Sequence, residues 1–227
     1  MKIFLIIGFL IAAAAAEFSI SDRPPTSVRV NLNNFLDRAI PHVAKFMIDH
    51  QLDPMKVPDI IDLVKIRRGP ITYKGYLHLS SGLMRNLTNF VRHNDVTATY
   101  RNKVLKVDIG TNHEALDVYF KYVLSILGIP YSGTATAVGK SLVLRVKVRF
   151  DILNYRLTLE SLKAESIGPV RVSLKDNVLV DWLVTPIVNI FLPLFKRTII
   201  VNVEKQGTAA IESTFREINA ILARRPR

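Results

Sequence analysis

The chain has 227 residues, a net charge of +12 from 31 Lys and Arg against 19 Asp and Glu, and no cysteine. This length suits one domain, which can bury enough surface to fold without disulfides. The absence of cysteine excludes disulfide frameworks, thiol catalysis and zinc–thiolate sites. The basic balance suits a phosphate-bearing or otherwise anionic partner, with a soluble cationic surface that has no specific partner as the alternative. The sequence has no basic block interleaved with aromatic residues, which is the pattern that would indicate nucleic-acid binding.

The N-terminal stretch MKIFLIIGFLIAAAAAEFS has the features of a secretory signal peptide. One Lys precedes an apolar run, and Ala14 and Ala16 fit the small-residue rule for cleavage. We therefore expect residues 1–16 to be removed and residues 17–227 to form one secreted, extracellular domain. A transmembrane anchor is the alternative, but the run is shorter than the ~20 residues that span a bilayer.

An amphipathic helix is predicted next. Its apolar residues fall at helical spacing and form one stripe: Leu32, Phe35, Leu36, Ala39, Val43, Phe46 and Met47. Pro41 lies on the opposite, polar side and is expected to bend or interrupt the helix near Ile40.

Residues 64–175 have the alternation of β-strands joined by short turns, which predicts an antiparallel meander. The run LDVYFKYVLSILG, residues 116–128, is more continuously apolar and predicts a strand covered on both faces. In the strands that follow, Leu144, Val148 and Phe150 are expected to face inward. Tyr155 is expected to face inward at the start of the return strand.

The stretch GTATAVGKS, residues 133–141, superficially resembles a nucleotide-binding P-loop. A P-loop needs four residues between its glycines and opens a helix, whereas here five separate Gly133 from Gly139 and a strand pattern follows. We interpret the stretch as a turn or a long hairpin connection.

The C-terminal third predicts a helix that is apolar almost all round, from Val178 to Val203, and that should therefore be enclosed. Pro186 and Pro193 are expected to kink it, and a one-sided helix resumes beyond Gly207. A membrane span is disfavoured because charged residues bound too short a stretch. These elements predict an α+β fold in which a strongly curved antiparallel sheet wraps around the C-terminal helix. The N-terminal helix would close the open side, giving a half super-roll.

The stretch LDPMKVPDI, residues 52–60, lies between the first helix and the sheet. In that position it resembles the mite group 7 allergen family and its insect relatives, which carry an equivalent Asp-Pro-Met-Lys-Val-Pro-Asp segment. The resemblance implies the curved-sheet fold of the tubular lipid-binding superfamily. That superfamily also contains juvenile-hormone-binding and Takeout-like carriers and the bactericidal/permeability-increasing proteins. The juvenile-hormone carriers use an N-terminal disulfide, which this chain lacks, so their hormone is not carried over.

No pattern of catalytic residues emerges. The sequence has no nucleophile elbow. The five histidines show no close metal-ligand spacing: His42, His50, His78, His93 and His113. We therefore expect neither an enzyme nor a metal or other cofactor. Asn86-Leu87-Thr88 fits the N-glycosylation rule, with a chance, unmodified sequon as the alternative.

Three functions remain open from the sequence. The first is a carrier of a hydrophobic ligand such as a lipid, fatty acid, terpenoid or lipopeptide, in a cavity between sheet and helices. Plain core packing is the alternative for each lining candidate: Phe35, Phe46, Leu144, Val148, Phe150, Tyr155, Trp182, Ile187, Phe191 and Phe195.

The second function is docking of a cationic defence or recognition protein on an anionic membrane or lipopolysaccharide. Its candidates form one group on a strand and another near the first strand: Arg145, Lys147 and Arg149, then Lys65, Arg67, Arg68 and Lys74. The third is a structural or interaction protein with a fully packed interior. The sequence leaves the ligand and the oligomeric state open.

Overall fold

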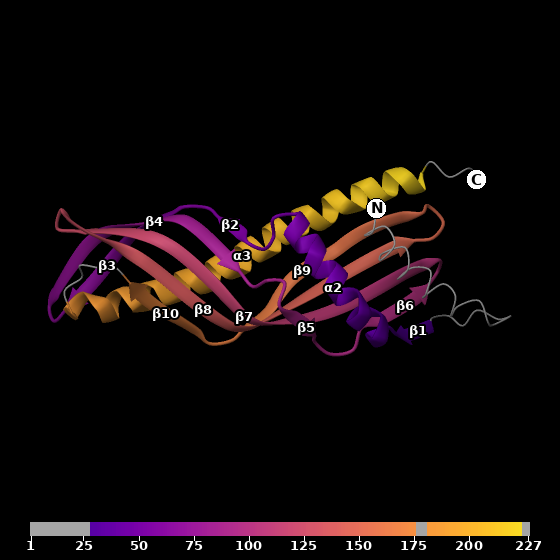
Figure 1. Ribbon diagram of the computed structural model, residues 1–227, viewed down its shortest axis with the longest axis horizontal. Coiled ribbons are helices and arrows are strands. Elements are labelled where there is room, and N and C mark those ends of the chain that lie inside the picture. The colour runs from indigo at the N-terminus through magenta and orange to yellow at the C-terminus, as the bar shows by residue number, and fades with distance from the viewer. Residues whose placement is uncertain (1–27, 176–180, 224–227) are drawn as a thin grey trace.

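The structure, a computed structural model, describes residues 28–175 and 181–223, which form one ten-stranded antiparallel sheet and two helices (Figure 1). The expected signal peptide, residues 1–16, lies outside the described residues. The helices are α2 (Asn33–Asp49) and α3 (Asp181–Leu222). The strands are β1 (Val28–Asn31), β2 (Met55–Val57), β3 (Ile60–Arg68), β4 (Ile71–Arg85), β5 (Phe90–Arg92), β6 (Thr97–Arg101), β7 (Val104–Ile126), β8 (Ile129–Asp151), β9 (Arg156–Ile167) and β10 (Val170–Lys175).

A single long hairpin, β7 and β8, runs through the whole sheet. The two strands have 23 residues each, about 75 Å of extended chain, and pair from Val104↔Asp151 to Ile126↔Ile129. Near the hairpin turn, β4 flanks β7 and β10 flanks β8. At the other end, β6 flanks β7 and β9 flanks β8. The curved sheet is not closed, and it gives the α+β architecture that the sequence predicts (Figure 1).

Helix α3 lies along the sheet because large apolar side chains recur every fourth residue on one face. The buried members of this row are Leu183, Ile187, Phe191, Phe195, Ile199 and Val203. Phe191 and Phe195 meet aromatic rings of β7, with Phe191 edge-on to Tyr122 at 5.6 Å and Phe195 at 5.6 Å from Phe120. Because an α-helix has about 3.6 residues per turn, side chains at every fourth position lie on nearly the same side of the helix. This row therefore forms a stripe that the sheet can cover.

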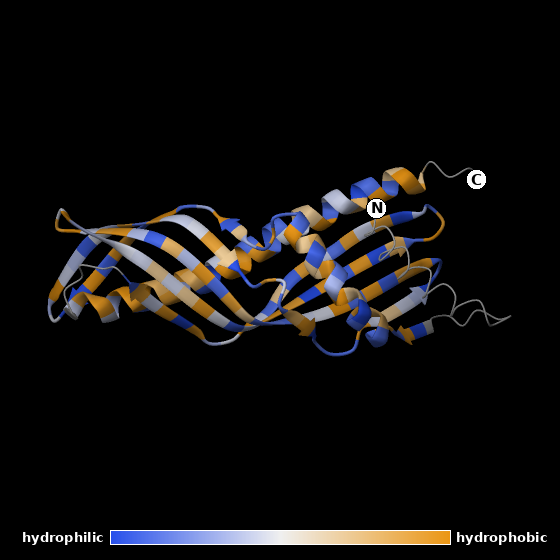
Figure 2. Cartoon of the chain, viewed as in Figure 1, coloured by the Kyte–Doolittle hydropathy of each residue, from blue (hydrophilic) through white to orange (hydrophobic). Residues whose placement is uncertain are grey.

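The structure corrects two predictions for α3. The helix is continuous through Pro186, Pro193 and Gly207, so it does not stop and resume. It is also not enclosed on all sides, since its outer face includes Val201 at 49% exposure. By length and composition alone the helix could cross a membrane. Figure 2 shows a mostly hydrophobic first half, whose buried row packs on the sheet.

The stretch GTATAVGKS is also not a loop. Residues 133–141 lie inside β8. Residues 133–140 pair with β7 on one side, and residues 134–139 pair with β10 on the other. Ala135 and Ala137 are buried, whereas Thr136 between them is half-buried and Val138 exposed. The alternation of small and β-branched residues is therefore a strand pattern, in which the small side chains leave room for α3.

Three further expectations differ from the structure. Helix α2 continues from Asn33 to Asp49 with Pro41 inside it, so no interruption occurs there. The end of β7 alternates between buried and exposed residues, because only one face of the sheet is covered there. Tyr155 is 53% exposed with φ of 48°, which places it in the turn before β9 instead of facing inward.

The core has two apolar clusters, one at each end of the hairpin. The first packs α3 residues 183–203 against β3, β4 and the adjoining halves of β7 and β8. The second packs Leu32 and Leu36 of the α2 region, and Phe215 of α3, against β6 and the far halves of β7 and β8. Between these clusters, α2, α3 and the middle of the sheet leave an internal space.

Candidate functional site

The internal space is a cavity of about 250 Å³ between the two helices and the sheet. Helix α2 contributes Leu36, Ala39, His42, Val43, Phe46 and Met47. The second half of α3 contributes Val203, Gly207, Ile211, Thr214 and Phe215. The sheet contributes Met55, Phe90, Ile109, Thr111, His113, Leu144, Val146, Val148 and Leu162, and the connections after α2 and before β5 contribute Leu52 and Leu87.

The cavity walls follow from local sequence. The α2 residues that line it recur at helical spacing along the predicted stripe, so this stripe faces the sheet. On α3, Gly207 lets the helix approach β9 closely, because a Cβ added there would lie 2.6 Å from Leu162 Cδ2. Beyond this contact, Ile211, Thr214 and Phe215 of α3 border the space.

Among the residues that the structure describes, no Lys, Arg, Asp or Glu lines the cavity. The polar side chains in the lining are His42, Thr111, His113 and Thr214. Thr214 donates its hydroxyl to the Ala210 carbonyl oxygen in its own helix at 3.0 Å. His42 is exposed, so the lining reaches solvent along α2. Such a lining suits an apolar molecule with few polar groups.

His113 is the buried titratable group of this lining, with 2% exposure. Its Nδ1 lies 2.8 Å from the Leu87 carbonyl oxygen, and its Nε2 lies 3.4 Å from Thr111 Oγ1. Burial lowers the pKa of His113 to about 4, against smaller raising effects from the Leu87 hydrogen bond and the charge of Asp53. His113 is therefore neutral at physiological pH.

Asp53, in the linker that resembles the group 7 allergen segment, holds the Leu87 carbonyl in place. Asp53 Oδ2 accepts hydrogen bonds from the Thr88 backbone N–H at 2.9 Å and from Thr88 Oγ1 at 2.7 Å. Its Oδ1 accepts one from the Asn86 N–H at 3.1 Å. The linker carboxylate therefore fixes the turn that carries the hydrogen-bond partner of His113.

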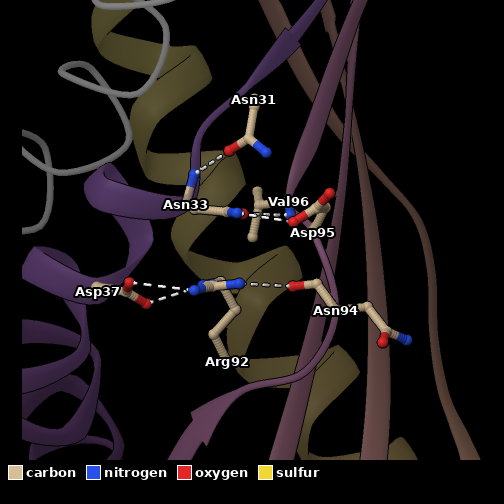
Figure 3. Close-up of polar contacts among 7 residues, drawn as sticks. All are labelled: Asn31, Asn33, Asp37, Arg92, Asn94, Asp95 and Val96. Atoms are coloured by element: carbon tan, nitrogen blue, oxygen red, sulfur yellow. Dashed lines mark hydrogen bonds and ion pairs between the residues drawn. The ribbon is translucent and has the colours of Figure 1, made fainter.

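The start of α2 is fastened to the connection between β5 and β6 (Figure 3). Asn33 Nδ2 donates to Asp95 Oδ1 at 2.7 Å, and Asn33 Oδ1 accepts from the Val96 N–H at 2.8 Å. One turn later, Asp37 receives two hydrogen bonds from the Arg92 guanidinium, at 3.0 and 3.4 Å. These contacts set the position from which α2 covers the cavity.

The structure places the ten predicted lining residues in different surroundings. Phe46, Leu144 and Val148 line the cavity. Ile187, Phe191 and Phe195 are buried in the solid packing of α3 on the sheet. Phe35 and Phe150 pack in the second cluster, and Tyr155 is exposed.

Trp182 lies far from the cavity lining, at the first cluster. Its ring is 5.5 Å from that of Tyr73, and the Arg68 guanidinium carbon lies 4.8 Å above it. Its fluorescence therefore reports on that end of the molecule and not on the cavity.

Sequence reasoning missed most of the cavity lining. The α2 members were visible as an apolar stripe, but periodicity does not tell a filled contact from an unfilled one. His113 gave a clearer signal, because it falls on the buried face of a strand pattern, where a polar side chain needs a reason.

The seven basic residues predicted to dock on an anionic surface form two groups, one on β8 and one on the β3–β4 hairpin. On β8, Arg145 is held by Asp108 at 2.7 Å and Glu165 at 3.0 Å. Lys147 and Arg149 are exposed on the same strand. Lys65, Arg67, Arg68 and Lys74 lie on the β3–β4 hairpin, where Lys65 pairs directly opposite Lys74.

Asn86 of the sequon is exposed, and its side chain donates to Asp117 Oδ2 at 2.6 Å. Among the residues that the structure describes, no group of three or more His, Asp or Glu side chains is arranged to hold a metal ion.

Comparison with known proteins identifies one family model, and the similar solved structures include two that are described below. The family model of the group 7 allergens matches residues 31–215. Lipopolysaccharide binding protein aligns at 15% identity with a TM-score of 0.49, over 82% of this chain but only 41% of that protein. Takeout 1 of Epiphyas postvittana aligns at 17% identity with a TM-score of 0.46, over 86% of this chain and 92% of that protein.

No curated protein sequence matches the chain. The family match is the comparison that carries the assignment, because it spans most of the chain, with all of α2, most of α3 and nearly the whole sheet. The chain belongs to the group 7 allergen family.

Proposed function

We propose that this protein is a secreted carrier that holds a small hydrophobic ligand in the cavity between α2, α3 and the sheet. The observation that carries the proposal is a space of about 250 Å³ whose lining, within residues 28–175 and 181–223, contains no Lys, Arg, Asp or Glu. An apolar cavity of about 150 Å³ already admits benzene. This space is larger and suits a medium-length alkyl or isoprenoid chain.

The cavity gives a sufficient driving force for binding. Each methylene removed from water contributes about 0.8 kcal/mol, so a ten-carbon chain gains roughly 8 kcal/mol before the losses of translational and conformational freedom. The lining needs no charged anchor to reach useful affinity. The function proposed is binding without chemistry.

Mass spectrometry of material extracted from the protein, purified without detergent from its natural secretion, tests the proposal. We expect a small set of neutral apolar molecules near one equivalent. A Val146→Phe variant, which fills part of the cavity floor, should carry much less. Extracts with no apolar ligand, together with no displacement of an alkyl fluorescent probe, would refute the carrier.

Secretion belongs to the same proposal. The N-terminal sequence supports cleavage after Ala16, and the exposed Asn86 supports a glycan on that side chain. Intact mass of the protein from culture medium, before and after glycosidase treatment, tests both. A chain that keeps residues 1–16 in the cell, or an unchanged mass after glycosidase, would remove the respective claim.

A second candidate function, docking on an anionic membrane, is favoured by the outer face of the β3–β4 hairpin. Lys65 and Lys74 lie directly opposite each other, and like charges in that position destabilise a sheet. Within the described residues no acidic side chain pairs with Lys65, Arg67 or Lys74. Ile61, Leu63 and Tyr76 beside them are 75%, 67% and 64% exposed. We call these six residues the hairpin patch.

Each basic residue near an anionic leaflet contributes about 1 kcal/mol, and the exposed apolar side chains can enter the interface. Sedimentation with phosphatidylserine vesicles should therefore retain the protein at low salt and release much of it at physiological salt. A Lys65→Glu/Lys74→Glu variant should lose this binding, whereas Lys147→Glu/Arg149→Glu, with the same charge change on β8, should keep most of it. Equal losses in both variants would contradict a specific patch.

A further inference from the structure

The outer face of the sheet carries a polar row across five strands, at the end of the β7–β8 hairpin away from its turn. The strand register places Arg29, Thr99, Lys106, Arg149 and Thr158 side by side, one on each of β1, β6, β7, β8 and β9. Neighbouring strands lie about 4.8 Å apart, so the row spans about 19 Å. The residues next to these in each strand pack in the second apolar cluster, so the row itself faces away from the core.

Further basic residues flank this row. Lys147 lies two residues from Arg149 on β8, and Arg101 and Arg156 lie at the ends of β6 and β9 that border the same face. All of them are exposed. We call five of these residues the sheet patch: Arg29, Arg101, Lys147, Arg149 and Arg156. It lies at the opposite end of the β7–β8 hairpin from the hairpin patch, as the positions of β1 and β6 against β3 and β4 show (Figure 1).

Acidic neighbours leave the charge of the sheet patch largely uncompensated. Glu160 is held by Lys106 at 2.7 Å, and Asp108 by Arg145 at the same distance. Asp151 accepts three hydrogen bonds from the β8–β9 turn, at 3.0 to 3.1 Å. Within residues 28–175 and 181–223, no acidic side chain forms an ion pair with a member of the sheet patch. Its cations are therefore available to an external anion.

The side chains between the cations indicate which anion fits. Thr99 and Thr158 offer hydroxyl groups within the row. The row has no large apolar side chain to enter a bilayer and no aromatic ring on which a nucleic-acid base would stack. The exposed Leu153 and Tyr155 lie in the β8–β9 turn instead. Separated cations with hydroxyl groups between them suit a chain of sugars that bears sulfate groups and free hydroxyls.

We propose that the sheet patch binds a sulfated polysaccharide, laid across β1, β6, β7, β8 and β9. This interaction goes beyond the proposed carrier function, because the patch lies on the face of the sheet opposite the cavity. The proposed secretion would bring the protein to the extracellular space, where such polysaccharides occur. Bound sulfates would also relieve the direct opposition of Lys106 and Arg149, since like charges in that position destabilise a sheet.

Binding of the full chain to immobilised heparin, a sulfated polysaccharide, tests the proposal. We expect binding at physiological salt that weakens as salt is raised, because exposed charges are screened. Heparin from which the sulfate groups have been removed should bind much more weakly. Duplex DNA and phosphatidylserine vesicles serve as other anionic probes in the same assay.

A matched pair of variants separates the sheet patch from net charge. Lys147→Ala/Arg149→Ala should weaken heparin binding roughly tenfold, the effect of losing two exposed ion pairs. Lys65→Ala/Arg67→Ala is the control, because it also removes one Lys and one Arg two residues apart on one strand. It should leave heparin binding nearly unchanged. Both pairs are exposed, so neither substitution should alter folding.

Acetylation of lysines in the wild-type protein gives a second readout that needs no variant. Heparin should protect Lys106 and Lys147 from the reagent, and Lys65 and Lys74 should react as before. Equal weakening in both variants, or equal protection of both pairs of lysines, would assign binding to net charge and overturn the inference. Equally tight binding of desulfated heparin or duplex DNA would also overturn it. Vesicle binding that depends on Lys147 and Arg149 while heparin binding does not would assign the patch to a membrane. None of these outcomes bears on the carrier.

Discussion

Replacing Val146 with Phe tests whether the space beneath α2 is unfilled by side chains and holds the ligand. Val146 lies on β8 in the cavity lining, between its strand partners Ile109 and Leu162, which also line the cavity. The larger ring adds about four carbons where a ligand would lie. At about 0.8 kcal/mol per carbon, the ligand loses roughly 3 kcal/mol, or about 200-fold in Kd.

The same substitution should leave folding intact. Because the ring enters unfilled space, the free energy of unfolding should stay level or rise, whereas overpacking of a filled core costs about 1–3 kcal/mol. Fluorescent-probe titration and urea unfolding of the same samples measure both effects. Val201→Phe, at an exposed valine on the outer face of α3, is the matched control and should change neither.

A folded Val146→Phe variant that binds the probe as tightly as the wild type would contradict ligand binding in this cavity. A loss of stability by the amount typical of overpacking would show that the space next to Val146 is already filled. Leu144→Phe, at a second lining position on the same strand, should give the same pattern.

Three other outcomes follow from the structure. Asn33→Ala removes two hydrogen bonds that fasten α2, so urea unfolding should show a loss of about 1–3 kcal/mol, and no loss would contradict the anchoring. Gly207→Ala places a Cβ 2.6 Å from Leu162 Cδ2, the end of a flexible side chain that borders the cavity and can turn into it. The gain in helix propensity of about 1 kcal/mol should therefore outweigh this contact and raise the thermal unfolding temperature, and a lower temperature would show that Leu162 is held in place. The pKa of His113 is lowered to about 4, so the unfolded chain binds the extra proton as pH falls from about 6.5 to 4, and stability should drop by about 3 kcal/mol across that range. Urea midpoints at several pH values should show a smaller drop in His113→Phe, and an equal drop would assign the acid loss to other groups.

Much of the fold could be predicted from the sequence because alternation and helical spacing are local signals. The stripe on α2, the strands and the long C-terminal helix were all identifiable in this way. The resemblance of residues 52–60 to the group 7 allergens agrees with the family match over residues 31–215.

The errors came where long-range pairing decides the structure. Glycines and threonines in residues 133–141 favour a turn locally, yet β7 and β10 pair with them and keep the chain extended. Gly207 looked like the end of a helix, but its missing side chain serves the close approach of α3 to Leu162. In both cases the small residues lie inside a packed strand or helix instead of in a turn.

The cavity was the hardest feature to predict. A sequence shows which side chains face inward, but whether their volumes fill the interior depends on how far apart the backbones lie. Ile187, Phe191 and Phe195 meet β7 at contact distance, while Ile211 and Phe215 on the same helix border the unfilled space. The two sets look alike in sequence.

The most direct measurement is a crystal structure of the protein grown with 1-decanol. The account predicts elongated density in the cavity, bordered by Leu144, Val146 and Ile211, with α2 above it. An interior closed by side chains, or alcohol bound only on the outer surface, would contradict the claim that this fold holds a ligand.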